Sequence, residues 1–280
     1  MTSATVSPSL LRRWMSDRRS AVGFSLVSLL FVAAFLGPLL SSYGPDQTDF
    51  LATLAPPSWI HFLGTDDLGR DVLSRVLAGA RVSLLVAVAS VGGALVVGLP
   101  IGLAAGYMGG KVDAILMRCM DVFLAFPGIL LALGITAALG ASLLNTIIAI
   151  AVINAPTIAR VARAQAMIVR RMDYVKANRA LGFSDLTILL RCVLPNTLSP
   201  VLVQASLLLA SSIITESYLS FLGLGVQAPT PTWGNMLRDA MSFLGQANWL
   251  AWFPGVAIFL TVLGFNLFGD GLHDRLDPRD

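Results

Sequence analysis

The chain has 280 residues, of which 56% are hydrophobic and 12% are charged, whereas an ordinary soluble domain carries about 25% charged residues. Its mean hydropathy of +0.77 therefore excludes a typical water-soluble domain and indicates a protein that folds in lipid. The net charge of +3 does not indicate a nucleic-acid-binding protein, because the basic residues fall on alternate connections between apolar runs.

The apolar runs predict six membrane-spanning helices, since a crossing helix needs about 20 mostly apolar residues. The first run follows four arginines, as in a signal peptide, but it is long enough to span and lacks a cleavage site, so we expect an uncleaved span. Three small residues at 140–142 separate the third and fourth runs, which form either a tight hairpin or one long bent helix. The six segments are 22–40, 82–107, 122–139, 143–158, 198–219 and 250–268.

The distribution of Lys and Arg predicts the orientation, because basic residues near span ends stay on the cytoplasmic side. Of the 19 Lys and Arg residues, all but Arg70, Arg75, Arg81 and Arg238 fall on one set of alternate connections. An even number of spans then places both termini in the cytoplasm. We expect an all-α polytopic membrane protein with a cytoplasmic tail at 1–21, a transmembrane domain at 22–272 and a cytoplasmic tail at 273–280. Within the domain, 160–195 forms a cytoplasmic loop and 220–249 an outer segment.

The outer connection before the second span carries a charged segment at 64–75. Thr65 can cap a short helix with an acidic first turn, and Arg70, Asp71 and Arg75 can pair at helical spacing. The segment is either a structural gate element or a surface helix that satisfies its own charges.

Several residues inside or beside the spans have two possible interpretations. Gly98 and Pro100 in the second span allow close helix packing, or else a hinge or pathway lining. Arg118 and Asp121 share a helix face at the cytoplasmic end of the third span and are predicted to pair. Glu216, near the outer end of the fifth span, must face protein or water. It therefore lines a path or pairs with a partner subunit.

The loop at 160–195 predicts two helices that meet at a corner. Helix-forming residues extend over 163–181, Gly182 ends this helix, and Ser184 caps a second short helix with Asp185 in its first turn. The tripeptide LPN at 194–196 is predicted to end the second helix, because proline lacks an amide donor and restricts the residue before it.

This loop resembles that of the membrane subunits of binding-protein-dependent ABC importers. Their signature is Glu-Ala-Ala, three residues, Gly, nine residues and Ile-x-Leu-Pro. The chain has KAN at 176–178, Gly182 and CVLP at 192–195, with the spacing intact. It departs from the signature at Lys176, Asn178 and Cys192.

Further motifs resemble the second permease subunit of the dipeptide, oligopeptide and nickel group. They are HFLGTD at 61–66, LGRDVLSR at 68–75, LAFP at 124–127, LSFLGLG at 219–225, GDGL at 269–272 and LDPR at 276–279. The resemblance implies a type I ABC importer permease of the bacterial inner membrane. It implies a homologous permease partner, one or two ATPase subunits and an extracytoplasmic substrate-binding protein. The outer segment at 220–249, with an amphipathic helix, either contacts that delivery protein or anchors the chain in the lipid bilayer.

The resemblance also implies roles for particular residues. The ATPase-coupling loop comprises Asp173, Tyr174, Lys176, Ala177, Asn178, Arg179, Ala180, Leu181, Gly182, Ser184, Asp185, Leu194 and Pro195. Apart from the resemblance, the sequence predicts a translocation path or gate that includes Glu216, Gly98, Pro100, Phe126 and Pro127.

No catalytic or metal-binding constellation is predicted. The two histidines fall on opposite sides of the membrane, and there is no phosphate-binding Gly-x4-Gly-Lys-Ser/Thr loop. We therefore expect a non-enzymatic subunit that binds no cofactor, with ATP and Mg²⁺ on the partner ATPase. The alternatives are a secondary transporter, which would usually carry ionisable groups near the middle of its spans, and a purely structural membrane subunit.

Overall fold

The structure is a computed structural model that describes residues 18–276. Most of the predicted N-terminal tail and the last four residues of the predicted C-terminal tail lie outside the described residues. The prediction of an all-α membrane fold is confirmed. Ten α-helices occur in the described part: α2 (Arg18–Leu40), α3 (Val72–Met108), α4 (Gly110–Leu124), α5 (Gly128–Leu139), α6 (Leu143–Val169), α7 (Asp173–Ala180), α8 (Asp185–Ile188), α9 (Leu194–Phe221), α10 (Trp233–Ala240) and α11 (Trp249–Leu276).

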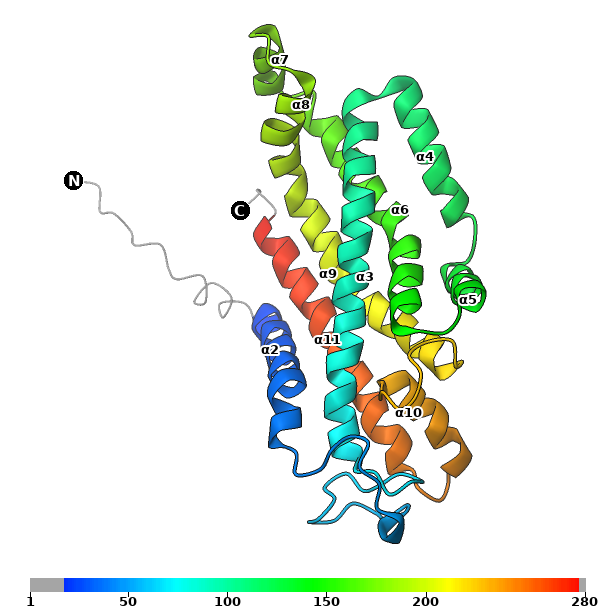
Figure 1. Cartoon of the computed structure of the whole chain (residues 1–280). Helices are drawn as coiled ribbons and strands as arrows, with labels where there is room; N and C mark the ends of the chain where they lie inside the picture. Colours follow the sequence, from blue (N-terminus) through cyan, green and yellow to red (C-terminus); the bar gives the residue numbers. More distant parts are fainter. Residues whose placement is uncertain (1–17, 277–280) are drawn as a thin grey trace, which may run out of the picture.

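Five helices are long and apolar enough to cross a membrane: α2, α3, α6, α9 and α11. Helix α8 and a π-helical turn extend α9 at its start. They form an elongated bundle in which α3 packs most extensively on α6 (Figure 1). The short helices α7 and α8 lie at one end of the bundle, while α10 and residues 41–71 lie at the other. We call these the α7 end and the α10 end.

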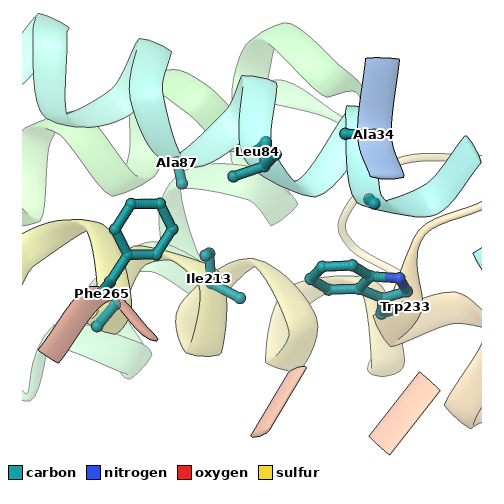
Figure 2. Close-up of a cluster of buried hydrophobic side chains, with 8 residues drawn as sticks. Ala34, Leu84, Ala87, Ile213, Trp233 and Phe265 are labelled. Atoms are coloured by element: carbon teal, nitrogen blue, oxygen red, sulfur yellow. The ribbon is translucent and has the colours of Figure 1, made fainter. Parts of the chain in front are cut away.

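An apolar core joins the helices near the α10 end (Figure 2). Leu84 and Ala87 of α3 face Ile213 of α9 and Phe265 of α11, and the Trp233 ring of α10 closes the cluster. The Trp233 indole N–H donates to the carbonyl oxygen of Val76 at 3.0 Å. The polar edge of this buried ring is thus satisfied, as burial requires.

The third predicted span is not one straight helix. It starts earlier than expected, at Gly110, and breaks between α4 and α5, whose axes differ by 85°. Pro127 explains the break, because it lacks an amide hydrogen and disfavours helical geometry at Phe126. Its own backbone is extended (φ −55°, ψ 122°), and its carbonyl oxygen accepts from Leu131 N in α5.

Two prolines inside the long helices leave carbonyl groups that side chains of neighbouring helices satisfy. Pro38 of α2 cannot donate to Ala34, and the Ala34 carbonyl oxygen accepts instead from Arg81 Nε of α3 at 3.3 Å. Pro200 of α9 likewise leaves the carbonyl of Asn196, which accepts from the Gln165 side chain of α6. The bond to Ala34 matters because this residue lies in the predicted span 22–40, where lipid offers no water to an unpaired carbonyl.

In the seam between α3 and α6, glycines of α3 lie against the backbone of α6. A Cβ atom on Gly98 would overlap the Ala155 carbonyl oxygen, and one on Gly106 would lie 2.5 Å from that of Arg163. Such close backbone approach is typical of small-residue helix pairs in membranes.

Candidate functional site

The corner between α7 and α8 has the backbone geometry of a Schellman cap. Gly182 N donates to the Arg179 carbonyl oxygen at 3.0 Å, and Phe183 N donates to that of Asn178 at 3.2 Å. Gly182 has φ +83°, which side-chain-bearing residues rarely adopt. The second helix starts as predicted: Ser184 Oγ accepts from Thr187 N, and Asp185 lies in the first turn of α8.

The predicted continuous helix over 163–181 is wrong. α6 ends at Val169, and α7 begins only at Asp173, after an extended residue at Met172 (φ −67°, ψ 148°). The turn lets Val175 pack with Val169 in a buried cluster that includes Leu103 of α3. One straight helix would carry Val175 away from that cluster, so tertiary burial overrides local helix propensity.

The predicted helix end at 194–196 is also wrong, because a π-helical turn at Leu189–Val193 leads directly into α9. Pro195 is the second residue of α9, and directly before it the π-helical turn lets Leu194 N donate to the Leu189 carbonyl oxygen. The Asn196 side chain donates to the Cys192 carbonyl oxygen at 2.7 Å, and Thr197 Oγ1 donates to that of Val193 at 2.9 Å. α8 is therefore continuous with a membrane-spanning helix.

Most side chains of the predicted coupling loop are exposed, and an apolar group stands out among them. These large apolar residues are not covered by the rest of the described chain, which is unusual outside an interaction surface. They are Tyr174, Leu181, Phe183, Leu186 and Leu190. Of the predicted loop residues, Asn178 and Leu194 are half-buried beneath this surface.

Asp173 in the first turn of α7 and Arg179 in its last turn each form a hydrogen bond with another side chain. Lys176 Nζ donates to Asp173 Oδ1 at 2.9 Å, and this bond lowers the pKa of the Asp173 carboxyl. The ionised carboxylate lies in the first turn of α7, where the helix dipole favours negative charge. At the other end, a hydrogen bond with the Tyr107 hydroxyl raises the pKa of Arg179.

Tyr107, in the last turn of α3, joins the bundle to the loop. Its hydroxyl donates to Asp185 Oδ1 at 2.6 Å and accepts from Arg179 Nη2 at 3.0 Å. The Arg179 guanidinium also lies 5.5 Å from the Tyr107 ring centroid, within cation–π range. Arg170 Nη1 donates to the carbonyl oxygens of Gly106 and Tyr107 at 3.0 and 3.1 Å. Sequence reasoning missed Tyr107 and Arg170 as loop contacts, since no local spacing connects them.

Ion pairs tie α4 to α6 at the same end. Asp121 Oδ1 accepts from Arg160 Nη2 at 2.7 Å, and Asp113 Oδ2 accepts from Arg163 Nη2 at 2.6 Å. The predicted local partner of Asp121, Arg118, is therefore replaced by a residue of another helix. Asp113 and Asp121 are eight residues apart, so they share the face of α4 that meets α6.

Glu216 of α9 is fully buried within the chain. Its carboxylate accepts from Ser83 Oγ of α3 at 3.1 Å and from Ser220 Oγ at 2.7 Å. The side chain thus connects α3 with α9 beside α10 and reaches no opening in this conformation. Hydrogen bonds of this kind offset part of the cost of placing a carboxyl group inside a membrane protein.

The other residues assigned to a path lie in different places. Gly98 is buried in the α3–α6 seam, whereas Pro100 is exposed on the outer face of α3. Phe126 and Pro127 are exposed at the break between α4 and α5. The structure does not bring these residues together with Glu216 in one cavity of the described chain.

At the α10 end, the predicted helix capped by Thr65 is wrong. Asp71, not Thr65, caps the next helix, accepting from Ser74 N at 2.8 Å, so α3 begins at Val72. Thr65 Oγ1 instead bonds to the Ala52 carbonyl oxygen and accepts from Ala55 N. Both Thr65 and Asp71 are good capping residues, and only the fold of the segment decides between them.

The charges of this segment are paired, although not along one helix. Asp66 Oδ2 accepts from Arg70 Nε at 2.7 Å and lies 3.5 Å from Arg75 Nε. Asp71 Oδ1 lies 3.0 Å from His61 Nδ1. Within residues 18–276, no group of three or more His, Cys, Asp or Glu side chains is placed to hold a metal ion.

Two family descriptions match the chain. Residues 98–279 match the family described as binding-protein-dependent transport system inner membrane component. Residues 9–57 match the N-terminal transmembrane domain of oligopeptide transport permease C.

Curated relatives cover nearly the whole chain. The di/tripeptide transport system permease protein DppC of Pseudomonas aeruginosa is 45% identical over 98% of this chain and 94% of its own length. The dipeptide transport system permease protein DppC of Alkalihalophilus pseudofirmus is 43% identical over 94% of this chain and 86% of its own. The glutathione transport system permease protein GsiD of Pectobacterium atrosepticum is 42% identical over 96% of this chain and 89% of its own length.

A solved structure shares the fold. The inward-facing MetNI methionine ABC transporter superposes with a TM-score of 0.60 at 19% identity, covering 72% of this chain and 95% of the matched chain. At this identity, the similarity concerns the arrangement of the helices.

Proposed function

Because this chain belongs to the family of binding-protein-dependent transport system inner membrane components, we propose that it is one permease subunit of an ATP-driven peptide importer. The observation that carries the proposal is the match to peptide permeases over nearly the whole chain. The relatives named for dipeptides, tripeptides and glutathione favour short peptides as the substrate class.

In this proposal, a homologous permease completes the translocation path, and one or two ATPase subunits bind ATP and Mg²⁺ and contact the α7 end. A soluble extracytoplasmic protein delivers the substrate to the α10 end. The basic residues near the α7 end then face the cytoplasm of the cell that holds the chain in its inner membrane. This chain hydrolyses no ATP.

The contacts of the loop suggest how movement would reach the spans. The exposed apolar residues of α7, the corner after it, α8 and the π-helical turn provide a surface for the ATPase. Displacement of this surface acts on α9 through the continuous backbone and on α3 through Tyr107 and Arg170. An ATPase that binds one arrangement of the loop more tightly shifts the bundle toward the corresponding opening.

Uptake into proteoliposomes that contain both permeases, the ATPases and the delivery protein tests the proposal. We expect accumulation of a labelled dipeptide only with ATP on the ATPase side. The same vesicles with a proton or sodium gradient and no ATP provide the comparison. Uptake that persists on the gradient alone would identify a secondary transporter, and assembly without any role in uptake would identify a structural subunit.

A further inference from the structure

Glu216 lies at a junction of three helices near the α10 end. Its side chain belongs to α9, and both α3 and α10 pack against this part of α9. A Cβ atom on Gly234, in the first turn of α10, would lie 2.4 Å from the Ser217 carbonyl oxygen. The Trp233 ring of α10 lies in the apolar core beside Ile213 of α9 (Figure 2). The carboxyl group is thus enclosed where the three helices meet.

Hydroxyl groups surround this carboxyl group. Ser83 Oγ and Ser220 Oγ donate to it at 3.1 and 2.7 Å. The hydroxyl groups of Ser217 and Thr232 lie close by, and all four residues are buried. The Ser217 side chain is only 8% exposed, yet its Oγ has no hydrogen-bond partner in the described chain. A buried hydroxyl without a partner is costly, so Ser217 Oγ is available to accept a further hydrogen bond.

No cation within residues 18–276 pairs with the carboxyl group, and Glu216 is the only charged residue of α9. On α3, Arg75 lies near carboxylates of the connection between α2 and α3, and Arg81 donates to carbonyl oxygens of α2. On α10, Arg238 pairs with Asp239. Helix α5 and the connection 222–232 carry no charge, and the charged residues of α6 and α11 lie toward the α7 end.

A neutral carboxylic acid fits these surroundings better than a carboxylate does. An ionised carboxylate without a cation is costly to bury, and hydroxyl donors offset only part of that cost. A protonated carboxyl group has one O–H donor and still accepts hydrogen bonds. It can accept from Ser83 and Ser220 and donate to Ser217 Oγ, which then has the partner that it otherwise lacks.

We propose that Glu216 is a neutral carboxylic acid that donates to Ser217 Oγ and positions α3 and α9 beside α10. In this arrangement Glu216 is a positioning residue, and it binds neither the substrate nor a driving ion. The protonation state is independent of the proposed function. Only the effect on uptake rests on that function.

Infrared difference spectroscopy of the complete transporter in lipid nanodiscs tests the protonation state. Subtracting the spectrum of Glu216→Gln from that of the wild type at neutral pH should leave the carbonyl stretch of a protonated carboxyl group. Ser217→Ala should shift this band, because the acceptor of the proton is lost. The control is Ser211→Ala, on an exposed serine of α9 whose hydroxyl donates to the Leu208 carbonyl oxygen. This variant should leave the band in place.

Uptake into proteoliposomes tests the positioning role. Glu216→Leu should lower ATP-dependent uptake at least about tenfold, because Ser83 and Ser220 lose their acceptor inside the junction. Glu216→Gln keeps a carbonyl oxygen and a neutral donor, so it should restore uptake to within about threefold of the wild type. The infrared measurement needs only the wild type and Glu216→Gln, so it decides the protonation state even if Glu216→Leu does not assemble.

Three results would overturn the inference. The first is a difference spectrum that contains carboxylate bands and no protonated-carboxyl band. The second is loss of the protonated-carboxyl band when Na⁺ replaces choline, which would identify a cation site. The third is a Glu216→Gln variant as defective as Glu216→Leu, which would show that the charge is required. Wild-type uptake that needs no ATP would instead refute the proposed function and leave the infrared result standing.

Discussion

At the scale of single residues, two glycines are required for different physical reasons. A Cβ atom on Gly182 would meet no atom within 4 Å, so only its backbone conformation, with φ +83°, demands glycine. A Cβ atom on Gly102 would overlap the carbonyl oxygen of Ala159, so there glycine is required for space. The first requirement concerns the loop corner, and the second concerns the packing of α3 on α6.

We expect Gly182→Ala to uncouple ATP hydrolysis from uptake while the complex still assembles. A left-handed backbone costs a residue with a Cβ atom about 1–2 kcal/mol, which favours a rearranged corner. Asparagine tolerates this conformation better, so Gly182→Asn should retain more uptake per ATP. The rate of ATP hydrolysis and the rate of peptide uptake are measured in the same proteoliposomes. The control is Gly255→Ala, a helical glycine with open space around it; equal defects in the alanine and asparagine variants would contradict the backbone argument.

Gly102→Ala should destabilise the bundle by about 1–3 kcal/mol, because the added methyl group meets a backbone carbonyl that cannot rotate away. Thermal unfolding in detergent measures the effect as a lower Tm. Gly92→Ala, in the same helix, provides the control, since its Cβ atom would meet nothing within 4 Å. Equal Tm values for the two variants would show that the α3–α6 seam relaxes more easily than its geometry implies.

At the scale of elements, the loop is joined to α3 by the side chains of Tyr107 and Arg170 and to α9 by the backbone. The Tyr107 hydroxyl contacts both Arg179 of α7 and Asp185 of α8. The side chains of Arg179 and Asp185 are 59% and 76% exposed, so solvent screening limits each bond to at most about 1 kcal/mol. The connection to α3 can therefore be weakened without touching the surface proposed to meet the ATPase.

We expect Tyr107→Phe to lower uptake per ATP several-fold, because α3 would no longer follow the loop closely. Uptake and hydrolysis are measured for Tyr107→Phe, Asp185→Asn and the double variant, since a coupled pair gives less than additive losses. Tyr218→Phe removes the hydroxyl of a largely exposed tyrosine on α9 and serves as the control. Strictly additive losses for Tyr107 and Asp185 would argue against a mechanical connection between them.

Hydropathy and capping rules predicted much of this architecture, and their failures have a common cause. The spans and the corner at Gly182 follow from local signals that act within a few residues. Three features depend instead on residues that are distant in the sequence. They are the break after Val169, the pairing of Asp121 with Arg160, and the capping of α3 by Asp71 and not Thr65. Sequence spacing ranks local partners first, so it cannot identify contacts that only the assembled bundle creates.

At the scale of the whole molecule, the direction of α6 determines the role of the bent pair α4–α5. Gly98 meets Ala155, and Gly106 meets Arg163 eight residues further along both helices. α3 and α6 are therefore parallel. The chain must return from the end of α3 toward the α10 end before α6 begins, and only α4 and α5 lie between them. The pair thus acts as one broken crossing.

This topology and the positive-inside rule make a prediction about accessibility. In a Cys119→Ser/Cys192→Ser background, Lys111→Cys at the start of α4 should react with a membrane-impermeant thiol reagent only from the cytoplasmic side. Thr53→Cys, in the connection between α2 and α3, should react only from outside. Both positions are exposed. Labelling is compared in intact spheroplasts and inverted vesicles.

Reaction of both cysteines from the same side would mean that α3 does not separate them across the membrane. An exchange of the two sides would invert the chain and leave the α7 end unable to meet a cytoplasmic ATPase.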